Sequence, residues 1–433
     1  MRSLSLAEAL AYAAAHQPDL RAAAARVEAV RTRRDVSQAR WYPTLTAAAE
    51  LVASTTNNST GSYLAVNGID NPRVSATAAR TAATASFQPY PSSLLGFGAR
   101  QEVYDFGRIS AQSAADALRT DAERLSAAGV KLVIENAVQE AYFAVYAAKA
   151  VVRASESAYV RAQAHRDQAK AGVDVGMRRP IELTRAQAVL DRYELERLRA
   201  RGGVVVAQAV LAAAVGVPDY RLDIAATPPS LAELPSLQAA FETMDRNPEL
   251  KSVLTLMRAQ EQQTRSIAAE MRPNLLVSGA ISGNAGGAPP SSGGSAEYHG
   301  LLPVVPNWDV ALVLSWPIFD QTVRARVRQS KADAQLYRAQ AEAVQRRLAA
   351  SIEEAYTEVV TARDALPVLQ RTLDAAIANY NQASARFNVG MSNAIEMADA
   401  EDLRTTAEID LARGTFDVAR ARAALGRFIA EGM

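Results

Sequence analysis

Apolar and polar residues alternate along four short segments of the chain. The alternation is clearest from Trp308 to Trp316, where every second residue is aromatic or aliphatic and the residues between include Asp309 and Ser315. A period of two places alternate side chains on opposite faces of a β-strand. The pattern therefore predicts strands with one apolar face at about residues 44–52, 97–104, 274–282 and 308–316.

Long stretches with a helical pattern follow the second and fourth of these segments. Residues from Asp105 to Ala171 contain no Pro, and apolar side chains recur at the spacing of one helix face. At 1.5 Å per residue, a helix of that length measures about 100 Å. Gly172 and Gly176 then favour a turn, and Pro180 fits the first position of a return helix. The pattern predicts two long helical hairpins, over about residues 105–215 and 320–428.

The two halves of the chain repeat the same order of features. His-Gln-Pro-Asp-Leu around Pro18 recurs 230 residues later as Arg-Asn-Pro-Glu-Leu around Pro248. The motif Val-Gly-Met-x3-Ile-Glu begins at Val175 and again at Val389, at an offset of 214. Such a duplication predicts two copies of one structural unit. We expect a first repeat over residues 1–216, a linker or equatorial segment over 217–236, and a second repeat over 237–433.

Four strands are too few to form a closed membrane sheet within one chain. In lipid every backbone N–H and C=O group has to be paired, so a membrane sheet closes into a barrel without edges. The smallest barrels of this kind use about eight strands. Two or more chains would have to contribute, and three would give twelve strands and twelve long helices. The same alternation is typical of a strand in a soluble β-sandwich, so this alternative stays open.

Composition narrows the class of protein without identifying a substrate. The chain of 433 residues is 49% hydrophobic and 21% charged, which is typical of a folded protein. Its 47 Lys and Arg side chains nearly balance 46 Asp and Glu, so no net charge attracts nucleic acid. The chain has no Cys, which excludes disulfides and thiolate metal sites.

Two further membrane signals are not expected in this chain. The longest apolar stretch, Val204 to Val217, has about 14 residues, whereas a spanning helix needs about 20. We therefore expect no transmembrane helix. The N-terminal residues lack an apolar stretch between a basic start and a small-residue cleavage site, so we expect no secretion signal here.

The duplicated layout resembles the TolC-type outer-membrane efflux protein family, the outer membrane factors. The resemblance rests on that layout, on the segment from Tyr104 to Arg108, and on the two Val-Gly-Met-x3-Ile-Glu turns. It covers essentially the whole chain, and the order and spacing of the motifs are more specific than any one motif. It implies a mainly α fold with membrane β-strands, in which a homotrimer forms a 12-stranded β-barrel continuous with a 12-helix α-barrel.

The resemblance also implies a passive duct and not an enzyme. The duct would lie in the outer membrane, extend into the periplasm, and serve as the exit of a tripartite efflux or type I secretion system. Implied partners are outer-membrane lipid, a periplasmic adaptor (membrane fusion protein) and an inner-membrane pump, and no cofactor, metal or nucleic acid is implied. The sequence lacks a phosphate-binding Gly-rich loop, a Gly-x-Ser-x-Gly motif and a His pair with metal spacing. A soluble coiled-coil scaffold would explain the helices but not the strand from Trp308 to Trp316.

Family members meet the adaptor through the turns between their long helices. A hairpin turn by itself would explain a Gly in each turn. It does not demand the same Val-Gly-Met in both copies, and this favours a contact surface. The residues to which the adaptor contact carries over are Val175, Gly176, Met177, Val389, Gly390 and Met391.

Carboxylates follow the second turn, where the family narrows the periplasmic entrance. Glu396 and Asp399 stand six and nine residues after Gly390, and threefold symmetry would arrange them in rings. Such rings repel one another and attract cations, which would give a closed gate an electrostatic character. The simpler alternative is that carboxylates in the first turns of a helix interact with its dipole.

The first copy differs at the corresponding gate positions. Glu182 and Arg185 stand where the second copy has Glu396 and Asp399. The family often has Arg two residues after the second Gly, where this chain has Ser392; Arg178 occupies that step in the first copy. We expect Glu396, Asp399, Glu182, Arg185 and Arg178 to form the periplasmic gate, with their pairing left open.

Aromatic residues flank the predicted strands. The eight steps from Trp308 to Trp316 span roughly 27 Å, close to the apolar band of a membrane barrel with aromatic girdles. Trp41 and Tyr42 come just before the first strand. We expect these four residues to form the membrane girdle.

Overall fold

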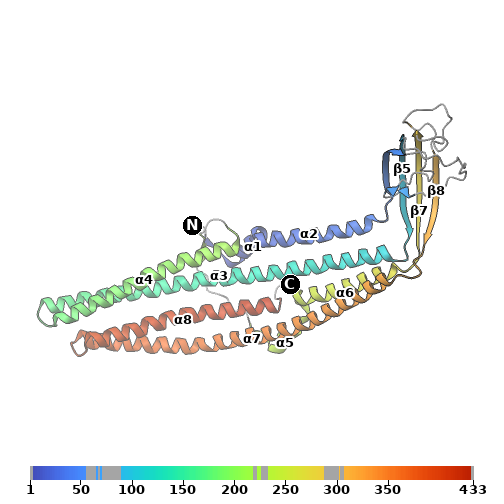
Figure 1. The fold of residues 1–433 in the computed structure, drawn as a ribbon. Coiled ribbons are helices and arrows are strands. Elements are labelled where there is room, and N and C mark those ends of the chain that lie inside the picture. The colour runs from blue at the N-terminus through green and yellow to red at the C-terminus, as the bar shows by residue number, and fades with distance from the viewer. Residues whose placement is uncertain are drawn as a thin grey trace, which may run out of the picture. The chain divides into compact units, whose positions relative to one another are not determined.

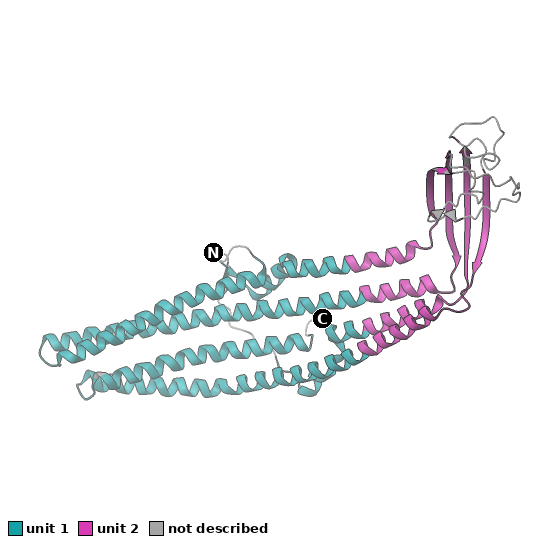
Figure 2. Ribbon diagram, viewed as in Figure 1, with its two compact units in different colours: residues 1–28, 121–254, 338–433 teal, residues 29–120, 255–337 magenta. Residues whose placement is uncertain are grey.

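A computed structural model describes most of the chain, and its described part is mainly helical (Figure 1). It divides into two compact units, each built from both halves of the sequence, so the units do not coincide with the expected repeats (Figure 2). Unit 1 comprises Met1–Glu28, Asp121–Leu254 and Arg338–Met433, and unit 2 comprises Ala29–Thr120 and Thr255–Tyr337. The described residues are 3–54, 65–66, 69–70, 89–217, 222–225, 233–286, 302 and 307–430.

Unit 2 contains an antiparallel sheet in the order β2-β5-β7-β8. One row of paired residues crosses all four strands, from Ala47 through Phe97 and Ile281 to Trp308. All four of these residues are exposed, so the sheet presents a continuous apolar row. The strands are β2 (Thr44–Ser54), β5 (Tyr90–Tyr104), β7 (Asn274–Gly286) and β8 (Asn307–Ser315).

Three of the strands are longer than the sequence predicts, and β5 differs most. It begins at Tyr90 and not at Phe97, and β2 continues to Ser54, so the segment between these two strands is shorter than the predicted strand bounds imply. The first residues of β5 include Pro91, Ser92 and Ser93, which are residue types typical of loops. Pro91 is tolerated because it pairs only with β2, through Ala53, and lies beyond the end of the β5–β7 ladder.

The junction from β5 to the following helix explains the segment from Tyr104 to Arg108. Phe106 and Gly107 both have positive φ, at 52° and 97°, so the backbone turns sharply there. Asp105 is buried, and its carboxylate accepts a hydrogen bond from the Gly107 N–H at 3.0 Å. The short motif is therefore a strand-to-helix cap.

Two long helical hairpins follow the sheet strands, as predicted (Figure 1). The outgoing helices have 67 and 68 residues, which corresponds to about 100 Å each. Gly216 ends the first return helix with φ of 80°, and its N–H donates to the Ala212 carbonyl at 3.0 Å. The helices are α3 (Arg108–Asp174), α4 (Pro180–Val215), α7 (Gln321–Asn388) and α8 (Ala394–Phe428).

Shorter elements precede each strand pair or join the copies. Pro18 and Pro248 both stand at the first position of a helix, where their missing N–H costs nothing. The helical elements are α1 (Leu6–His16), α2 (Pro18–Ala39), α5 (Leu237–Glu242), η1 (Met244–Arg246) and α6 (Pro248–Ala269). Two-residue strands pair β1 (Ser3–Leu4) with β6 (Asp223–Ile224) and β3 (Ala65–Val66) with β4 (Ile69–Asp70).

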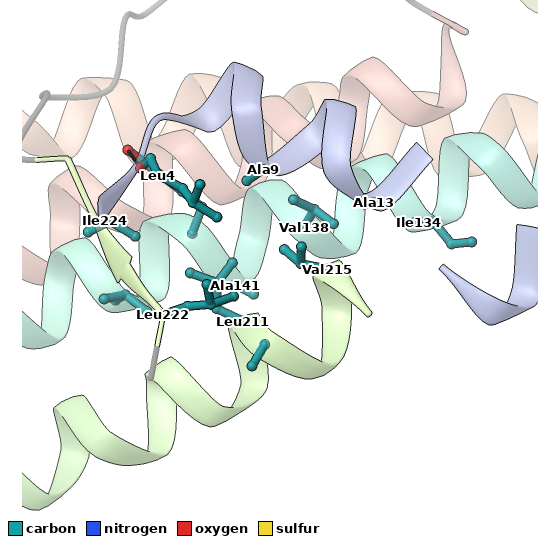
Figure 3. Close-up of a cluster of buried hydrophobic side chains, with 13 residues drawn as sticks. Leu4, Ala9, Ala13, Ile134, Val138, Ala141, Leu211, Val215, Leu222 and Ile224 are labelled. Carbon is teal, nitrogen blue, oxygen red and sulfur yellow. Dashed lines mark hydrogen bonds between the residues drawn. The ribbon is translucent and has the colours of Figure 1, made fainter. Parts of the chain in front are cut away.

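Unit 1 contains two hydrophobic clusters with matching positions, one from each copy of the duplication. One cluster packs α1, α3 and α4 around Val138, Ala141 and Leu211 (Figure 3). The other cluster packs α5, α7 and α8. Six core positions of the first cluster recur in the second at the sequence offset of 214, so the duplication extends to packing. The pairs are Ile134 and Leu348, Val138 and Ile352, Ala141 and Ala355, Val145 and Val359, Leu211 and Leu425, and Val215 and Ile429.

One helix differs from the expectation about membrane spans. Among the described helices, α4 is long and apolar enough to cross a membrane by length and composition. Only 22% of its most apolar 18-residue stretch is buried within the chain, and Val205, Val206 and Val210 are exposed. A single helix of this kind is weak evidence for a membrane span.

Candidate functional site

The turn between α3 and α4 is a tight hairpin with exposed apolar side chains. The Gly172 carbonyl accepts hydrogen bonds from the Met177 N–H at 2.8 Å and the Arg178 N–H at 3.0 Å. Gly176 has φ of 75°, a conformation that favours glycine. The exposed fractions of Val175 and Met177 are 69% and 84%.

The turn between α7 and α8 has the same construction. Gly390 has φ of 76°, and the Met391 N–H donates to the Arg386 carbonyl at 2.8 Å. Val389 and Met391 are exposed to a similar degree, at 69% and 71%. Positive φ accounts for the glycines, but a turn does not require exposed Val and Met. The six residues predicted for adaptor contact thus lie at the two hairpin tips of unit 1.

Arg178 joins the two tips. Its guanidinium donates to the Glu182 carboxylate at 3.3 Å and to the Phe387 carbonyl at 2.9 Å, and it lies 3.7 Å from the centre of the Phe387 ring. Gly172 makes room for this arrangement, because a Cβ there would lie 2.7 Å from the Arg178 Cδ. Gln168 and Asn388 add a second link between the hairpins, at 2.8 Å.

Glu396 is paired within the second hairpin. Its carboxylate binds Arg386 at 3.0 Å and accepts a hydrogen bond from the Ser392 hydroxyl at 2.7 Å. Ser392, which stands where the family often has Arg, therefore binds the Glu396 carboxylate as a hydrogen-bond donor. Asn393 caps α8 by accepting from the N–H groups of Ile395 and Glu396, at 2.9 and 3.0 Å.

The structure brings together only some of the predicted gate residues. Arg178 and Glu182 form a pair, whereas Glu396 pairs with Arg386, which sequence reasoning did not select. Asp399 and Arg185 are exposed and form no ion pair with any residue of the described ranges. The gate assignment therefore stays a prediction.

A buried ionic network connects the two hairpins farther along the helices from the tips. Sequence reasoning missed this network. Arg161 of α3 donates from Nε to the Glu401 carboxylate of α8 at 2.7 Å, and its Nη2 lies 3.5 Å from Glu408. Glu401 is only 2% exposed, and the Thr405 hydroxyl donates to the same carboxylate at 3.3 Å. A more exposed pair, Arg192 with Asp402 at 2.7 Å, joins α4 to α8.

Burial shifts the pKa values of groups in this network. Desolvation raises the pKa of Glu401, although Arg161 opposes this shift. Desolvation lowers the pKa of His165, and the Arg161 charge lowers it further. His165 Nε2 lies 3.0 Å from the Tyr380 hydroxyl, and burial raises the pKa of that tyrosine. No signal in the sequence marks these groups, because they come together only when four helices pack.

The predicted girdle residues lie at the ends of sheet strands in unit 2. Trp308, Trp316 and Tyr42 are exposed, at 76%, 61% and 74%, whereas Trp41 is half-buried. Trp316 follows the last residue of β8, and its indole N–H donates to the Met271 carbonyl at 3.2 Å. This hydrogen bond fixes the ring where the strand meets the helical segment.

The family model described as "Outer membrane efflux protein" matches residues 9–217 and 242–431. The match covers both copies of the duplication. The chain belongs to the outer membrane efflux protein family. The resemblance inferred from the motifs is thus confirmed. The family assignment supports an efflux channel located in the outer membrane and not an enzyme.

Solved structures share the fold of this outer membrane efflux protein. The outer-membrane channel OprN is 22% identical with a TM-score of 0.76, covering 99% of this chain and 90% of that chain. The CmeC outer membrane channel of Campylobacter jejuni is 15% identical with a TM-score of 0.78, covering 99% and 86%. The MtrE outer membrane channel of Neisseria gonorrhoeae is 18% identical with a TM-score of 0.75, covering 99% and 89%. No curated protein matches by sequence.

Proposed function

We propose that three copies of this chain form a passive duct through the outer membrane and periplasm. The duct serves as the exit of a tripartite efflux or type I secretion system. It opens at its periplasmic end through contact with an adaptor protein, which an inner-membrane pump accompanies.

The open edges of the sheet carry this proposal. Among the described strands, β2 and β8 have a neighbour on one side only. An unpaired strand edge is not tolerated in lipid, so a membrane sheet has to continue into another copy. Three copies would supply twelve strands, which is enough for a closed barrel.

The exposed side chains of the sheet support a lipid-facing surface. The row from Ala47 to Trp308 is apolar and exposed, and Val310, Leu312 and Leu314 continue along β8 with exposed fractions of 71%, 67% and 65%. Alternate residues on one face of a membrane barrel meet lipid in this way. Trp308, Trp316, Trp41 and Tyr42 would form the aromatic girdle.

The long helical hairpins favour the second part of the proposed duct, a barrel of α-helices. Four long helices per chain would give twelve in a trimer, and the exposed Val205, Val206 and Val210 of α4 provide apolar surface for a neighbouring chain. At the tips, the exposed Val-Gly-Met turns offer the adaptor contact. Glu396, Asp399, Glu182, Arg185 and Arg178 would control the aperture between the tips.

Disulfide cross-linking between the two edge strands tests the trimer. The chain has no cysteine, so one Cys placed on β2 and one on β8 can react only with each other or with themselves. We expect a scan of such pairs, for example Leu45→Cys with Leu314→Cys, to give covalent species that end at three chains. A matched pair on β5 and β7, which already neighbour each other, should cross-link only within one chain. Products ending at two chains, or no products between chains, would contradict the proposal.

A further inference from the structure

A small cavity lies beside the Arg161–Glu401 ion pair, between the two helical hairpins. Its volume is about 30 Å³, and apolar side chains from all four long helices form most of its wall. Two polar side chains, His165 and Glu401, line it as well. Their Nδ1 and Oε2 atoms are buried and have no hydrogen-bond partner among the described residues. Buried polar atoms usually have a hydrogen-bond partner, so these two atoms are positioned to bind a water molecule or a proton.

We propose that His165 and Glu401 form a buried proton-binding site that sets how tightly the two hairpins hold together. The cavity has room for a water molecule, which needs roughly 10–15 Å³. Such a water would join the carboxylate to the imidazole and let one proton be shared between them. The site concerns hairpin pairing, so the inference does not depend on the proposed trimer.

Each helix packed around the site contributes groups that act on this proton. Glu401 faces Arg161 from α3, Tyr193 from α4 and Tyr380 from α7, with Arg404 on its own helix. Glu408 receives hydrogen bonds or ion pairs from Arg161 and Arg404. Two cations are thus shared by two carboxylates. His165 is the histidine beside them, and burial together with the Arg161 charge lowers its pKa.

The duplication did not copy this site. At the offset of 214, the counterparts of Arg161 and His165 are Ala375 and Asn379, and the counterpart of Glu401 is Gln187. None of these three side chains titrates. The site therefore belongs to one hairpin interface and is not a general property of the repeated unit.

The two groups affect hairpin pairing in opposite directions as the pH falls. Burial raises the pKa of Glu401, so the paired state holds its proton more tightly than the separated state, and acid strengthens pairing. Burial lowers the pKa of His165, so the separated state takes up its proton first, and acid weakens pairing. The effects oppose each other between the two ordinary pKa values, about 4.3 for Glu and 6.5 for His. Removing one group should reveal the effect of the other.

Spin-label distances within the full-length protein test this directly. Cysteines at the exposed positions Gln163 and Thr406 would carry the labels, and excess unlabelled chains restrict the distance to one chain. In Glu401→Gln, we expect the separated population to rise severalfold from about pH 7.5 to about pH 5. In His165→Asn, we expect it to fall over the same range. The double variant should show neither change.

Two control variants separate this site from general titration. His16→Asn removes an exposed histidine on α1, and Glu358→Gln removes an exposed carboxylate on α7, and both should respond to pH as the unsubstituted chain does. The proposal is overturned if Glu401→Gln and His165→Asn change the pH response in the same direction, or do not change it. If Glu401→Gln does not fold, the sign of the His165→Asn response alone decides.

Discussion

The side-chain amide of Asn247 donates a hydrogen bond to the Phe428 carbonyl at 3.0 Å, near the end of α8. The first copy repeats this contact, because Gln17 donates to the Ala214 carbonyl at 3.1 Å. Asn247 corresponds to Gln17 at the offset of 230, and Phe428 corresponds to Ala214 at the offset of 214. One contact joins the start of α2 to the end of α4, and the other joins the start of α6 to the end of α8.

Replacing Asn247 by Ala should destabilise the protein by about 1–2 kcal/mol. The side chain is buried, and its Oδ1 also accepts from the Glu249 N–H at 2.9 Å, so the change removes a helix cap together with the Phe428 contact. Gln17→Ala is the matched variant and should cost less, because Gln17 is half-exposed. Chemical unfolding in detergent would measure both. An equal or smaller loss for Asn247→Ala would contradict this expectation.

Replacing Glu396 and Asp399 by Ala should raise single-channel conductance and weaken cation selectivity. The change would remove two carboxylates per chain from the proposed entrance and free Arg386 from its 3.0 Å ion pair. Loss of this exposed pair should cost less than about 1 kcal/mol of stability, so unfolding would not explain a change in current. Replacing the exposed Asp364 and Asp374 of α7 provides a control with the same loss of charge. Single-channel currents equal to those of the unsubstituted protein would contradict the gate assignment.

Arg178→Ala should loosen the contact between the hairpin tips. The Arg178 side chain is 14% exposed, and removing it deletes the hydrogen bond from its charged guanidinium to the Phe387 carbonyl, at a cost of about 1.5–3 kcal/mol. The Phe387 carbonyl keeps the hydrogen bond that it accepts from the Gly390 N–H at 3.1 Å. Gly172→Ala should act in the same direction without changing charge, because the new methyl group would displace Arg178. Arg179→Ala is the control, since Arg179 is an exposed arginine that follows Arg178 directly in the same turn. Distances between labels on the two tips would measure the effect, and equal distances in all three variants would refute it.

Gly216, which follows the last residue of α4, and Gly203, inside α4, should respond oppositely to substitution by Ala. Gly216→Ala should destabilise by about 1 kcal/mol or more, because φ is 80° and a Cβ would lie 3.1 Å from the Gln17 Cα. Gly203→Ala should stabilise by about 0.5–1 kcal/mol, because an added Cβ would meet no neighbouring group within 4 Å outside its own stretch of helix, and Ala favours a helix interior. Unfolding midpoints of the two variants should shift in opposite directions, and a shift of both in the same direction would contradict this expectation.

Long elements were predictable from the sequence because their boundaries are marked by residue type. Pro180 and Gly216 delimit α4, and the Val-Gly-Met turns locate both hairpin tips. The start of β5 was not predictable, since Pro91 and the serines after it lack alternation and pair only because β2 and β7 extend that far. Hydrogen bonding in a sheet can thus override a weak local pattern.

The candidate site was predictable only where local sequence determines it. The exposed tips follow from a Gly turn flanked by apolar residues, but the partner of Glu396 depends on the geometry of the turn. Arg161 and Glu401 are separated by 240 residues, and each is one charge among many on a long helix. Their pairing follows from how two hairpins pack, which periodicity within one helix does not specify.

The unpaired edges of β2 and β8 have a consequence before any barrel exists. A newly made copy exposes these two edges together with an apolar face, which is the combination that leads to aggregation in water. In the proposed trimer, the sheet would therefore need to be kept from other strand edges until the barrel closes. Closure of the barrel would then compete with aggregation in water.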